Sequence, residues 1–555
     1  MILSRPLALL RSLTAFANPS GPGLLVGAIF LAMALAPSLI PRTGLVQGAL
    51  AGAAFPVGYL VGSLSVLLWQ LLGLRQPPPE KVETIRQILA ALSFALILWA
   101  LSQATGWQDR LHQALDLPPV ESARPFTIAF AALLTATLFI LIARLFRRAV
   151  LAVAHRLSPL MPERLALVIG FLSAVLLFDL VANDVLLSRV LAAMDSSYQR
   201  VDEYLPASQQ PPRDPLRSGS AASLLDWQHL GAEGRNRIND PLDAATIEGI
   251  TGAPAQEPLR IYVGLGSAET PEERAQLALA EALRTDAFSR GTLVIVTPTG
   301  TGWVDPASML PLEVLTGGDV ATISVQYSYL PSWLSLLTVP EYGNTTARAV
   351  FAAIHGHWKA LPPETRPKLY LNGLSLGAMN SDLSADFFDL IADPYDGAFW
   401  IGPPFTSRLW NQVTTGRQPE SPAWLPRFRD GSVVRFLDQT HDAISERPWG
   451  PMRILYLQYA TDPITFFSPS IAWREPDWMR APRGPGVIPE FRWMPLVTFL
   501  QVGFDVMTAT LTPKGHGHVY SARDYLRGWQ AMLDPPGWSD AQKARLLAEI
   551  DARGL

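Results

Sequence analysis

The chain has no cysteine among its 555 residues. This absence excludes a disulfide framework, a cysteine nucleophile and metal sites built on thiolates. The 8 histidines are not spaced like metal ligands, and no G-x-G-x-x-G fingerprint is present, so we expect neither a metal nor a dinucleotide cofactor. A net charge of −4 offers no basic surface, and we expect no nucleic-acid partner.

Charged residues are also scarce, at 17% of the chain against 49% hydrophobic residues. Before residue 195, five long apolar runs occupy residues 24–40, 45–74, 88–104, 126–143 and 165–182. Each run approaches the roughly 20 residues that a helix needs to cross the hydrocarbon layer, and none shows the polar face of a soluble helix. We predict that residues 1–194 form an all-α transmembrane domain of about five spans, of which the first two could instead form a re-entrant hairpin. Residues 1–23 resemble a short interfacial helix more than a cleaved signal peptide.

Basic residues in the short loops predict the orientation of these spans. With five spans, ten basic residues lie on one side: Arg5, Arg11, Arg75, Lys81, Arg86, Arg144, Arg147, Arg148, Arg156 and Arg164. Five lie on the other side: Arg42, Arg110, Arg124, Arg189 and Arg200. The richer side is expected to be cytoplasmic. We therefore predict a multi-pass protein of the inner (plasma) membrane, with the N-terminus inside and the residues after 195 outside.

Polar and small residues inside the spans raise two further hypotheses. Gly48/Gly52 and Gly58/Gly62 have G-x-x-x-G spacing, which lets helix backbones approach closely. We interpret them as packing sites within the chain rather than as a dimer interface. Asp179 lies well within the last apolar run, where an ionisable group is a functional hypothesis by default. The alternatives are a helix cap or interhelical hydrogen bond, and a proton or ligand role.

The pattern changes after residue 195. Residues 195–258 are polar and rich in Pro and Ser, which is typical of an extended linker with helical pieces. From residue 259 onward, strands are predicted at 259–266, 292–298, 320–329, 368–373, 397–404 and 453–463, with amphipathic helices between them. This alternation indicates a mostly parallel sheet with helices on both faces. A functional site is then expected beyond the carboxyl ends of the strands.

The segment LNGLSLGAMNSD, residues 371–382, places Ser375 between Gly373 and Gly377. A G-x-S-x-G pattern alone is weak, but here it joins a predicted strand to a predicted helix, which is the context of a nucleophile elbow. Downstream come Asp462, after a later strand, and His516 and His518 near the C-terminus. The order Ser, Asp, His is that of an α/β-hydrolase triad.

Each residue type in this order has a chemical purpose. A serine hydroxyl attacks only when an imidazole takes its proton, and a carboxylate orients the imidazole and stabilises its cation. Backbone N–H groups must meet the oxyanion; Leu376 is the first expected donor, and Thr301 or Gly302 in the loop after strand 292–298 is the second. His518 is favoured over His516 as the base because a helix begins shortly after it.

Other aspartates and histidines could compete for the acid and base positions, but most have a structural interpretation. Asp462 precedes a proline and could be a turn residue, with Asp393 and Asp505 as weaker rivals for the acid. His355 and His357 lie within a predicted helix and are read as structural. Asp382 and Asn380 follow the elbow and are read as helix-face residues.

The whole chain resembles the bacterial α/β-hydrolase family that carries its own multi-span membrane N-terminus. The resemblance rests on TPTGTGWVDP, QYSYLPSW, NGLSLGAMNSD, YLQYATDPI and GHGHVY, and covers nearly all of the chain. It implies a serine-hydrolase fold for residues 259–555 and esterase or lipase chemistry. Ser375, Asp462 and the histidine fall on the triad positions of the superfamily.

The insertion between the last two predicted strands, at about 405–450, is rich in Trp, Phe, Pro and Arg and predicts a cap or lid. We therefore expect a membrane-anchored carboxylic ester hydrolase acting on a lipid or lipid-like ester, since the anchor would place the site near a bilayer. Two alternatives stay open: an acyltransferase on the same fold, and a non-catalytic transport or scaffold protein that uses the fold as a binding module.

Overall fold

The computed structural model describes residues 19–555 except 207–208, 332–333, 336–339, 444 and 446. The predicted N-terminal interfacial helix lies almost wholly outside the described residues. The chain divides into two units. Unit 1 comprises residues 1–192, 468–479 and 486–508, and unit 2 comprises residues 193–467, 480–485 and 509–555. The first boundary lies close to the predicted one at residue 194.

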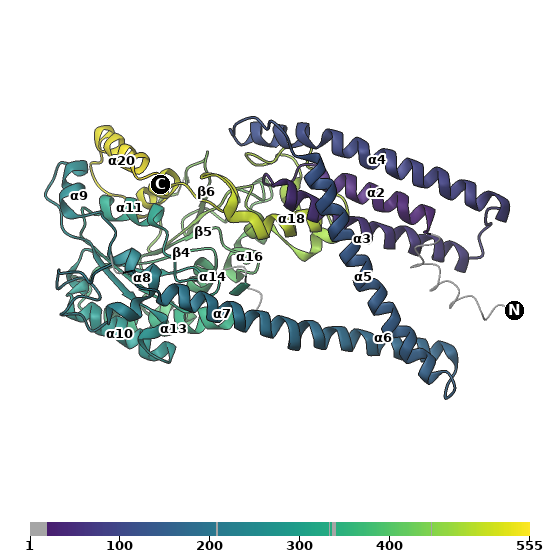
Figure 1. The fold of residues 1–555 in the computed structure, drawn as a ribbon. Helices are drawn as coiled ribbons and strands as arrows, with labels where there is room; N and C mark the ends of the chain where they lie inside the picture. The colour runs from purple at the N-terminus through teal and green to yellow at the C-terminus, as the bar shows by residue number, and fades with distance from the viewer. Residues whose placement is uncertain (1–18, 207–208, 332–333, 336–339, 444, 446) are drawn as a thin grey trace. The chain divides into compact units, whose positions relative to one another are not determined.

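Unit 1 is helical (Figure 1). Its N-terminal helices are α2 (Gly21–Leu35), α3 (Gly44–Leu71), α4 (Pro79–Ala114), α5 (Pro125–Leu157) and α6 (Glu163–Asp179). Later segments add η5 (Pro469–Ala472), η6 (Asp477–Met479) and α18 (Val497–Thr508).

The sequence predicted about five spans, and four of them are long apolar helices in the structure. Among the described residues, four helices are long and apolar enough to cross a membrane: Gly44–Leu71, Pro79–Ala114, Pro125–Leu157 and Glu163–Asn183. Helix α2 has only 15 residues, or about 22 Å at 1.5 Å per residue, which is short of the hydrocarbon thickness. The rest of the first apolar run, after Leu35, leaves the helix at Ala36 and leads into α3, so hydrophobicity alone overestimated the helix.

Small residues let the helices of unit 1 approach closely. A Cβ atom at Gly48 would lie 2.5 Å from the carbonyl oxygen of Ile128 on α5, and one at Gly58 would lie 2.7 Å from that of Val26 on α2. Gly52 likewise abuts α5 and Gly62 abuts α2. Both G-x-x-x-G pairs thus pack within the chain, as interpreted from the sequence.

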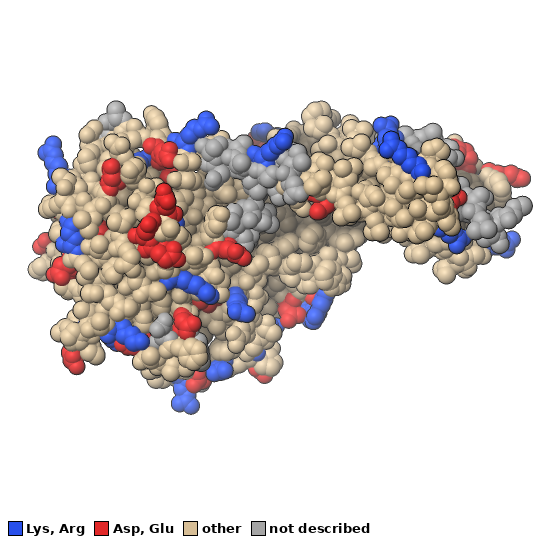
Figure 2. Space-filling view, turned by 90° about the horizontal axis from the view of Figure 1, so that it is seen from below, with Lys and Arg blue, Asp and Glu red and all other residues tan. Residues whose placement is uncertain are grey.

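Outward-facing side chains of these helices are apolar. Phe126, Phe130, Leu133 and Leu176 are each about two-thirds exposed or more. In the space-filling view, charged side chains are spread over unit 2 and are sparse along the helices of unit 1 (Figure 2). An apolar surface of this extent requires a partner or a lipid environment.

A buried ion pair joins distant parts of the chain within unit 1. Arg42 Nε lies 2.7 Å from Asp505 Oδ1, and both side chains are fully buried. Asp505 also accepts hydrogen bonds from Ser38 Oγ and the Leu39 N–H. Asp505 is therefore a structural residue of unit 1, and the predicted domain 259–555 does not form one continuous unit.

Helix α6 continues through a π-helical stretch (Leu180–Leu187) into α7 (Ser188–Glu203). Asp179 is exposed at the start of this stretch, and its Oδ1 accepts a hydrogen bond from Asn183 Nδ2 at 2.7 Å. The contact lies along one helix at the change of helical type, which favours the local structural reading of Asp179 over an interhelical one.

Unit 2 contains a seven-stranded sheet in the order β1-β3-β2-β4-β5-β7-β6. All six pairings are parallel. The strands are β1 (Leu259–Val263), β2 (Thr292–Thr297), β3 (Val320–Val325), β4 (Lys368–Leu374), β5 (Gly397–Ile401), β6 (Val434–Leu437) and β7 (Arg453–Leu457). Strands β1 to β3 are buried along their whole length, which explains their continuous hydrophobic runs.

Helices cover both faces of this sheet, as predicted (Figure 1). They are α8 (Gly231–Ile238), α9 (Ala244–Thr251), α10 (Pro271–Arg284), α11 (Pro306–Leu315), α13 (Pro340–Ala360), α14 (Leu376–Asp382), α15 (Phe387–Ala392), α16 (Arg408–Thr415), α17 (Pro463–Phe466), α19 (Ala522–Leu533) and α20 (Asp540–Ala552). Helices α10, α13 and α14 pack together on one face, whereas α11, α19 and α20 pack on the other.

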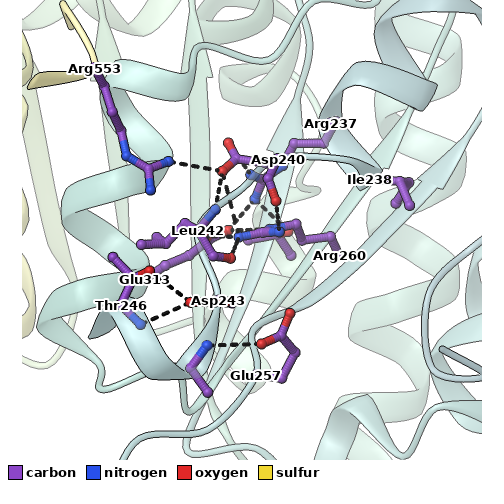
Figure 3. Close-up of polar contacts among 12 residues, drawn as sticks. Arg237, Ile238, Asp240, Leu242, Asp243, Thr246, Glu257, Arg260, Glu313 and Arg553 are labelled. Atoms are coloured by element: carbon purple, nitrogen blue, oxygen red, sulfur yellow. Dashed lines mark hydrogen bonds and ion pairs between the residues drawn. The ribbon is translucent and has the colours of Figure 1, made fainter. Parts of the chain in front are cut away.

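The predicted linker is folded into unit 2. Helix α8 packs on β1, and a buried charge network holds the two together (Figure 3). Glu313 of α11 accepts from Arg260 of β1 at 2.6 Å and from Arg237 of α8 at 2.5 Å. Asp240 lies 3.9 Å from both of these arginines and 3.5 Å from Arg553. The polar composition of this region thus reflects buried ion pairs as well as solvent exposure.

The predicted cap contributes a strand to the sheet. Residues of β6, within the predicted insertion at 405–450, pair in parallel with β7. The sequence signal is the short run VVRFL at 433–437, which is only 4 residues long as a strand. The rest of the insertion contains α16 and irregular segments.

Candidate active site

Ser375 lies between β4 and α14 in a strained backbone conformation. Its φ is 58° and its ψ is −123°, which a non-glycine residue adopts at a cost of about 1–3 kcal/mol. The neighbouring glycines explain how the turn closes. A Cβ atom at Gly373 would collide with the backbone of Gly377, and one at Gly377 would collide with the carbonyl oxygen of Thr297. Ser375 is thus in the geometry of a nucleophile elbow.

Asp462 lies just after β7 and is fully buried. Its Oδ1 accepts N–H bonds from Ile464 at 2.9 Å and Thr465 at 3.4 Å, because Asp462 is the N-cap of α17. Its Oδ2 lies 2.7 Å from Nδ1 of His518. The aspartate–proline sequence is therefore a helix start that also holds a histidine.

His518, rather than His516, contacts the carboxylate of Asp462. Its N–H donates to the Ala509 carbonyl oxygen at 3.2 Å, and its side chain is almost fully buried. Nε2 of His518 is buried with no hydrogen-bond partner among the described residues. His516 pairs through its backbone with Val519 and is partly exposed. We carry His518 forward as the candidate base.

Ser375 and His518 each adjoin the end of β5. The Ser375 N–H donates to the Ile401 carbonyl oxygen at 2.9 Å. The next residue, Gly402, lies directly against the imidazole, because a Cβ atom there would be 2.8 Å from Cε1 of His518. No hydrogen bond joins Ser375 Oγ to His518 Nε2 among the described residues. Such bonds are often long in an unliganded site and tighten when substrate binds.

The loop after β2 lies beside the elbow because β2 pairs with β4 in the register Thr297↔Gly373. The Gly302 N–H already donates to the Thr299 carbonyl oxygen at 2.9 Å, whereas the Thr301 N–H donates to no backbone carbonyl oxygen within the described part of the chain. Gln326 Nε2 donates to the Thr301 carbonyl oxygen at 3.1 Å, and the Tyr262 hydroxyl donates to that of Gly302 at 2.7 Å.

The geometry therefore favours Thr301 over Gly302 as the second oxyanion donor. Leu376, the first expected donor, is the first residue of α14 and is buried. Its N–H belongs to the first turn of the helix, where backbone N–H groups have no partner within the helix.

The rival residues have other partners. Asp393 is held by Arg366 at 2.5 and 2.6 Å, and Nε2 of His355 lies 2.9 Å from the Asp393 carbonyl oxygen. His357 contacts the ring of Phe288. Burial raises the pKa of Asp382 to about 6, and its carboxylate accepts the Leu409 N–H at 3.1 Å. None of these contacts involves the Ser375 corner.

Sequence reasoning missed Tyr520. Its hydroxyl donates to Asp462 Oδ2 at 2.6 Å, and its ring lies in edge contact with His518. The available signal was its place two residues after His518 in GHGHVY. In the described part of the chain, no group of three or more His, Asp or Glu side chains could hold a metal ion.

Comparisons with known proteins agree with this fold. Residues 259–546 match a model described as alpha/beta-hydrolase family, and residues 35–241 match its companion, alpha/beta-hydrolase family N-terminus. The chain belongs to the alpha/beta-hydrolase family. This alpha/beta-hydrolase matches no curated protein and no solved structure. The predicted resemblance is thus confirmed for both parts of the chain.

Proposed function

We propose that this alpha/beta-hydrolase is a membrane-anchored serine hydrolase that cleaves a carboxylic ester. The observation that carries the proposal is the pair formed by Asp462 and His518. Nε2 of His518 has no hydrogen-bond partner among the described residues, and the strained Ser375 adjoins the same end of β5 as this histidine. A buried imidazole nitrogen that has lost its hydrogen bond to water costs stability, and groups that carry such a cost cluster at functional sites.

The reaction follows from these positions. Ser375 Oγ attacks the ester carbonyl carbon while Nε2 of His518 takes the hydroxyl proton, and Asp462 stabilises the imidazolium. The N–H groups of Leu376 and Thr301 hold the oxyanion. The tetrahedral intermediate expels the alcohol, which receives the proton from His518, and leaves an acyl group on Ser375. Water activated by His518 then releases the acid.

A lipid or lipid-like ester is the proposed substrate class. The support is the large exposed apolar surface of α3 to α6, which a bilayer would cover and which would bring the site to lipid esters. An acyltransferase would use the same acyl-enzyme and differ only in the acceptor. A binding module without chemistry is disfavoured by the backbone strain stored at Ser375.

The charge rule supports an extracytoplasmic hydrolase unit in the inner membrane. With four spans, the loops between α3 and α4 and between α5 and α6 share one side, with eight basic residues: Arg75, Lys81, Arg86, Arg144, Arg147, Arg148, Arg156 and Arg164. Seven lie on the other side, with residues 195–555: Arg5, Arg11, Arg42, Arg110, Arg124, Arg189 and Arg200. The richer side is expected inside, so that with four spans the N-terminus, expected inside with five spans, is expected outside together with residues 195–555.

Fluorophosphonate labelling tests the nucleophile and the sidedness together. We expect the full chain to be labelled, and Ser375→Ala to abolish labelling. Ser384→Ala is the matched control, since the hydroxyl of this buried serine donates to the Ser381 carbonyl oxygen, away from the candidate site. Labelling of Ser375→Ala at the wild-type level would refute the role of Ser375 as the nucleophile.

A membrane-impermeant probe should label intact spheroplasts as strongly as permeabilised ones. Labelling only after permeabilisation would place the site on the cytoplasmic side. Product analysis with added alcohols separates hydrolysis from acyl transfer.

A further inference from the structure

The carboxylate of Asp462 is crowded by donors. Oδ2 alone faces three: His518 Nδ1 at 2.7 Å, the Tyr520 hydroxyl at 2.6 Å and Thr465 Oγ1 at 3.1 Å. Oδ1 accepts the two N–H bonds of the helix start. Tyr520 and His518 therefore share one oxygen atom of the candidate acid.

We propose that Tyr520 is a positioning residue for the proposed reaction: its hydroxyl holds Asp462 Oδ2 in place and shares its charge, so that this oxygen orients His518. The inference rests on the proposed function for its catalytic meaning, but the contacts that carry it do not depend on the substrate.

Tyr520 is itself held firmly. Its ring stacks on Tyr459 with centroids 4.3 Å apart, and the Tyr459 hydroxyl accepts the N–H of Ser521 at 3.0 Å and donates to Asp524. A Cβ atom at Gly402 would lie 2.8 Å from the Tyr520 hydroxyl. The phenol thus reaches Asp462 with little freedom of its own, as a positioning group requires.

The phenol stays a donor across the working pH range. Burial and then the charge of Asp462 raise the pKa of Tyr520 well above its ordinary value. The titratable groups that face the ring are Asp462 and His518 at the site, Tyr459 stacked on it, and Tyr525 at its edge.

Loss of the hydroxyl should have two effects. Oδ2 would be free to turn away from His518, which lowers the rate. Without the Tyr520 hydrogen bond, the negative charge of Asp462 would also interact more strongly with protonated His518, which stabilises the imidazolium. Because the reaction needs neutral His518, the acid limb of the profile of kcat/KM against pH should then move to higher pH.

The test compares two isosteric variants of the full chain in detergent. We expect Tyr520→Phe to lower kcat/KM for a short-chain nitrophenyl ester roughly tenfold to hundredfold, as for the loss of a hydrogen bond to a charged group, and to move the acid limb upward. Tyr459→Phe is the matched control, since it removes a buried hydroxyl from the same stack without touching Asp462. An unmoved acid limb in Tyr520→Phe, or equal shifts in both variants, would overturn the proposal.

Two further measurements test the role of Tyr520. The first preserves the shape of the side chain, and the second needs no catalytic activity. Placing 3-fluorotyrosine at 520 preserves the shape and strengthens the donor, so the acid limb should move to lower pH. In ¹⁵N-histidine spectra of the Ser375→Ala chain, the Hδ1 signal of His518, assigned by its loss in His518→Gln, should move in Tyr520→Phe and not in Tyr459→Phe. An unmoved signal overturns the role of Tyr520. A wild type that hydrolyses no ester while this signal moves overturns the proposed function alone.

Discussion

At the residue scale, the candidate site depends on two positions with a positive backbone φ. Ser375 has a φ of 58° in a turn that two flanking glycines close. Gly402 has a φ of 49° and supports both His518 and Tyr520. The sequence predicted Ser375 because its motif is local. It did not predict Gly402 or Tyr520, since their roles arise from contacts between distant segments.

Gly402→Ala should displace the imidazole. Its Cβ atom would lie 2.8 Å from His518 Cε1 and from the Tyr520 hydroxyl, so we expect the second-order labelling rate with a fluorophosphonate to fall by at least about tenfold. The strained φ should also cost about 1–2 kcal/mol.

Gly537→Ala separates these two effects. Gly537 also has a positive φ, of 74°, but nothing lies within 4 Å of its Cβ position. This variant should lose similar stability and keep the labelling rate. If Gly402→Ala is labelled as fast as Gly537→Ala, the glycine does not position the histidine.

At the element scale, buried ion pairs attach segments that sequence composition suggested were free. Arg237 of α8 and Arg260 of β1 share Glu313 of α11, which fastens the predicted linker to the edge of the sheet. Strand β6 is a second example, since a run of 4 residues is too short to be predicted as a strand and is identified only by its pairing with β7. Periodicity predicts single elements, whereas their attachment depends on partners elsewhere.

Glu313→Gln should destabilise unit 2 by roughly 3–5 kcal/mol, because it leaves two buried guanidinium groups without their carboxylate. Burial opposes the charge of Glu313, but Arg237 and Arg260 outweigh it and lower its pKa to about 2. The stabilisation from ionised Glu313 is fully present above the pKa of this carboxyl in the unfolded chain, near 4.5, and is lost as pH falls toward the folded pKa of about 2. The difference in the free energy of unfolding between wild type and Glu313→Gln should therefore be largest above about pH 4.5 and should decrease below it.

Urea unfolding followed by fluorescence at pH 7, 5 and 4 measures this gap. Asp551→Asn is the control, since its pair with Arg523 is more than half exposed on both sides and should be worth at most about 1 kcal/mol. A gap that stays constant from pH 7 to pH 4 would contradict a lowered pKa at Glu313.

At the scale of the whole molecule, unit 1 is assembled from the N-terminal part of the chain and two later segments. Segments 468–479 and 486–508 lie between Asp462 and His518 in the sequence, yet they belong to the helical unit. Val497 packs with Phe30, Ala34, Leu50 and Ala54. Neither unit therefore contains all of its residues in a single stretch of the chain.

Arg42→Gln should therefore loosen the attachment of α18 within unit 1. The variant leaves Asp505 buried without its cation, at a cost of roughly 3–5 kcal/mol. We expect a lower Tm in detergent and faster proteolysis between residues 486 and 508. Glu490→Gln is the control, because the Arg110–Glu490 pair is nearly half exposed and 3.7 Å long. An unchanged cleavage pattern in Arg42→Gln would argue against this role.

The sequence by itself determined the class of each part of the molecule. Apolar runs indicate helices for a membrane, alternation indicates a parallel sheet, and a serine between strand and helix indicates an elbow, because each of these signals arises from neighbours in the chain. Only the tertiary structure decided the count of four long helices in the described residues, the contacts of Asp462 with His518 and Tyr520, and the placement of residues 468–479 and 486–508. These depend on which distant segments share a buried charge or a tight backbone approach, and such contacts leave no periodic trace in the sequence.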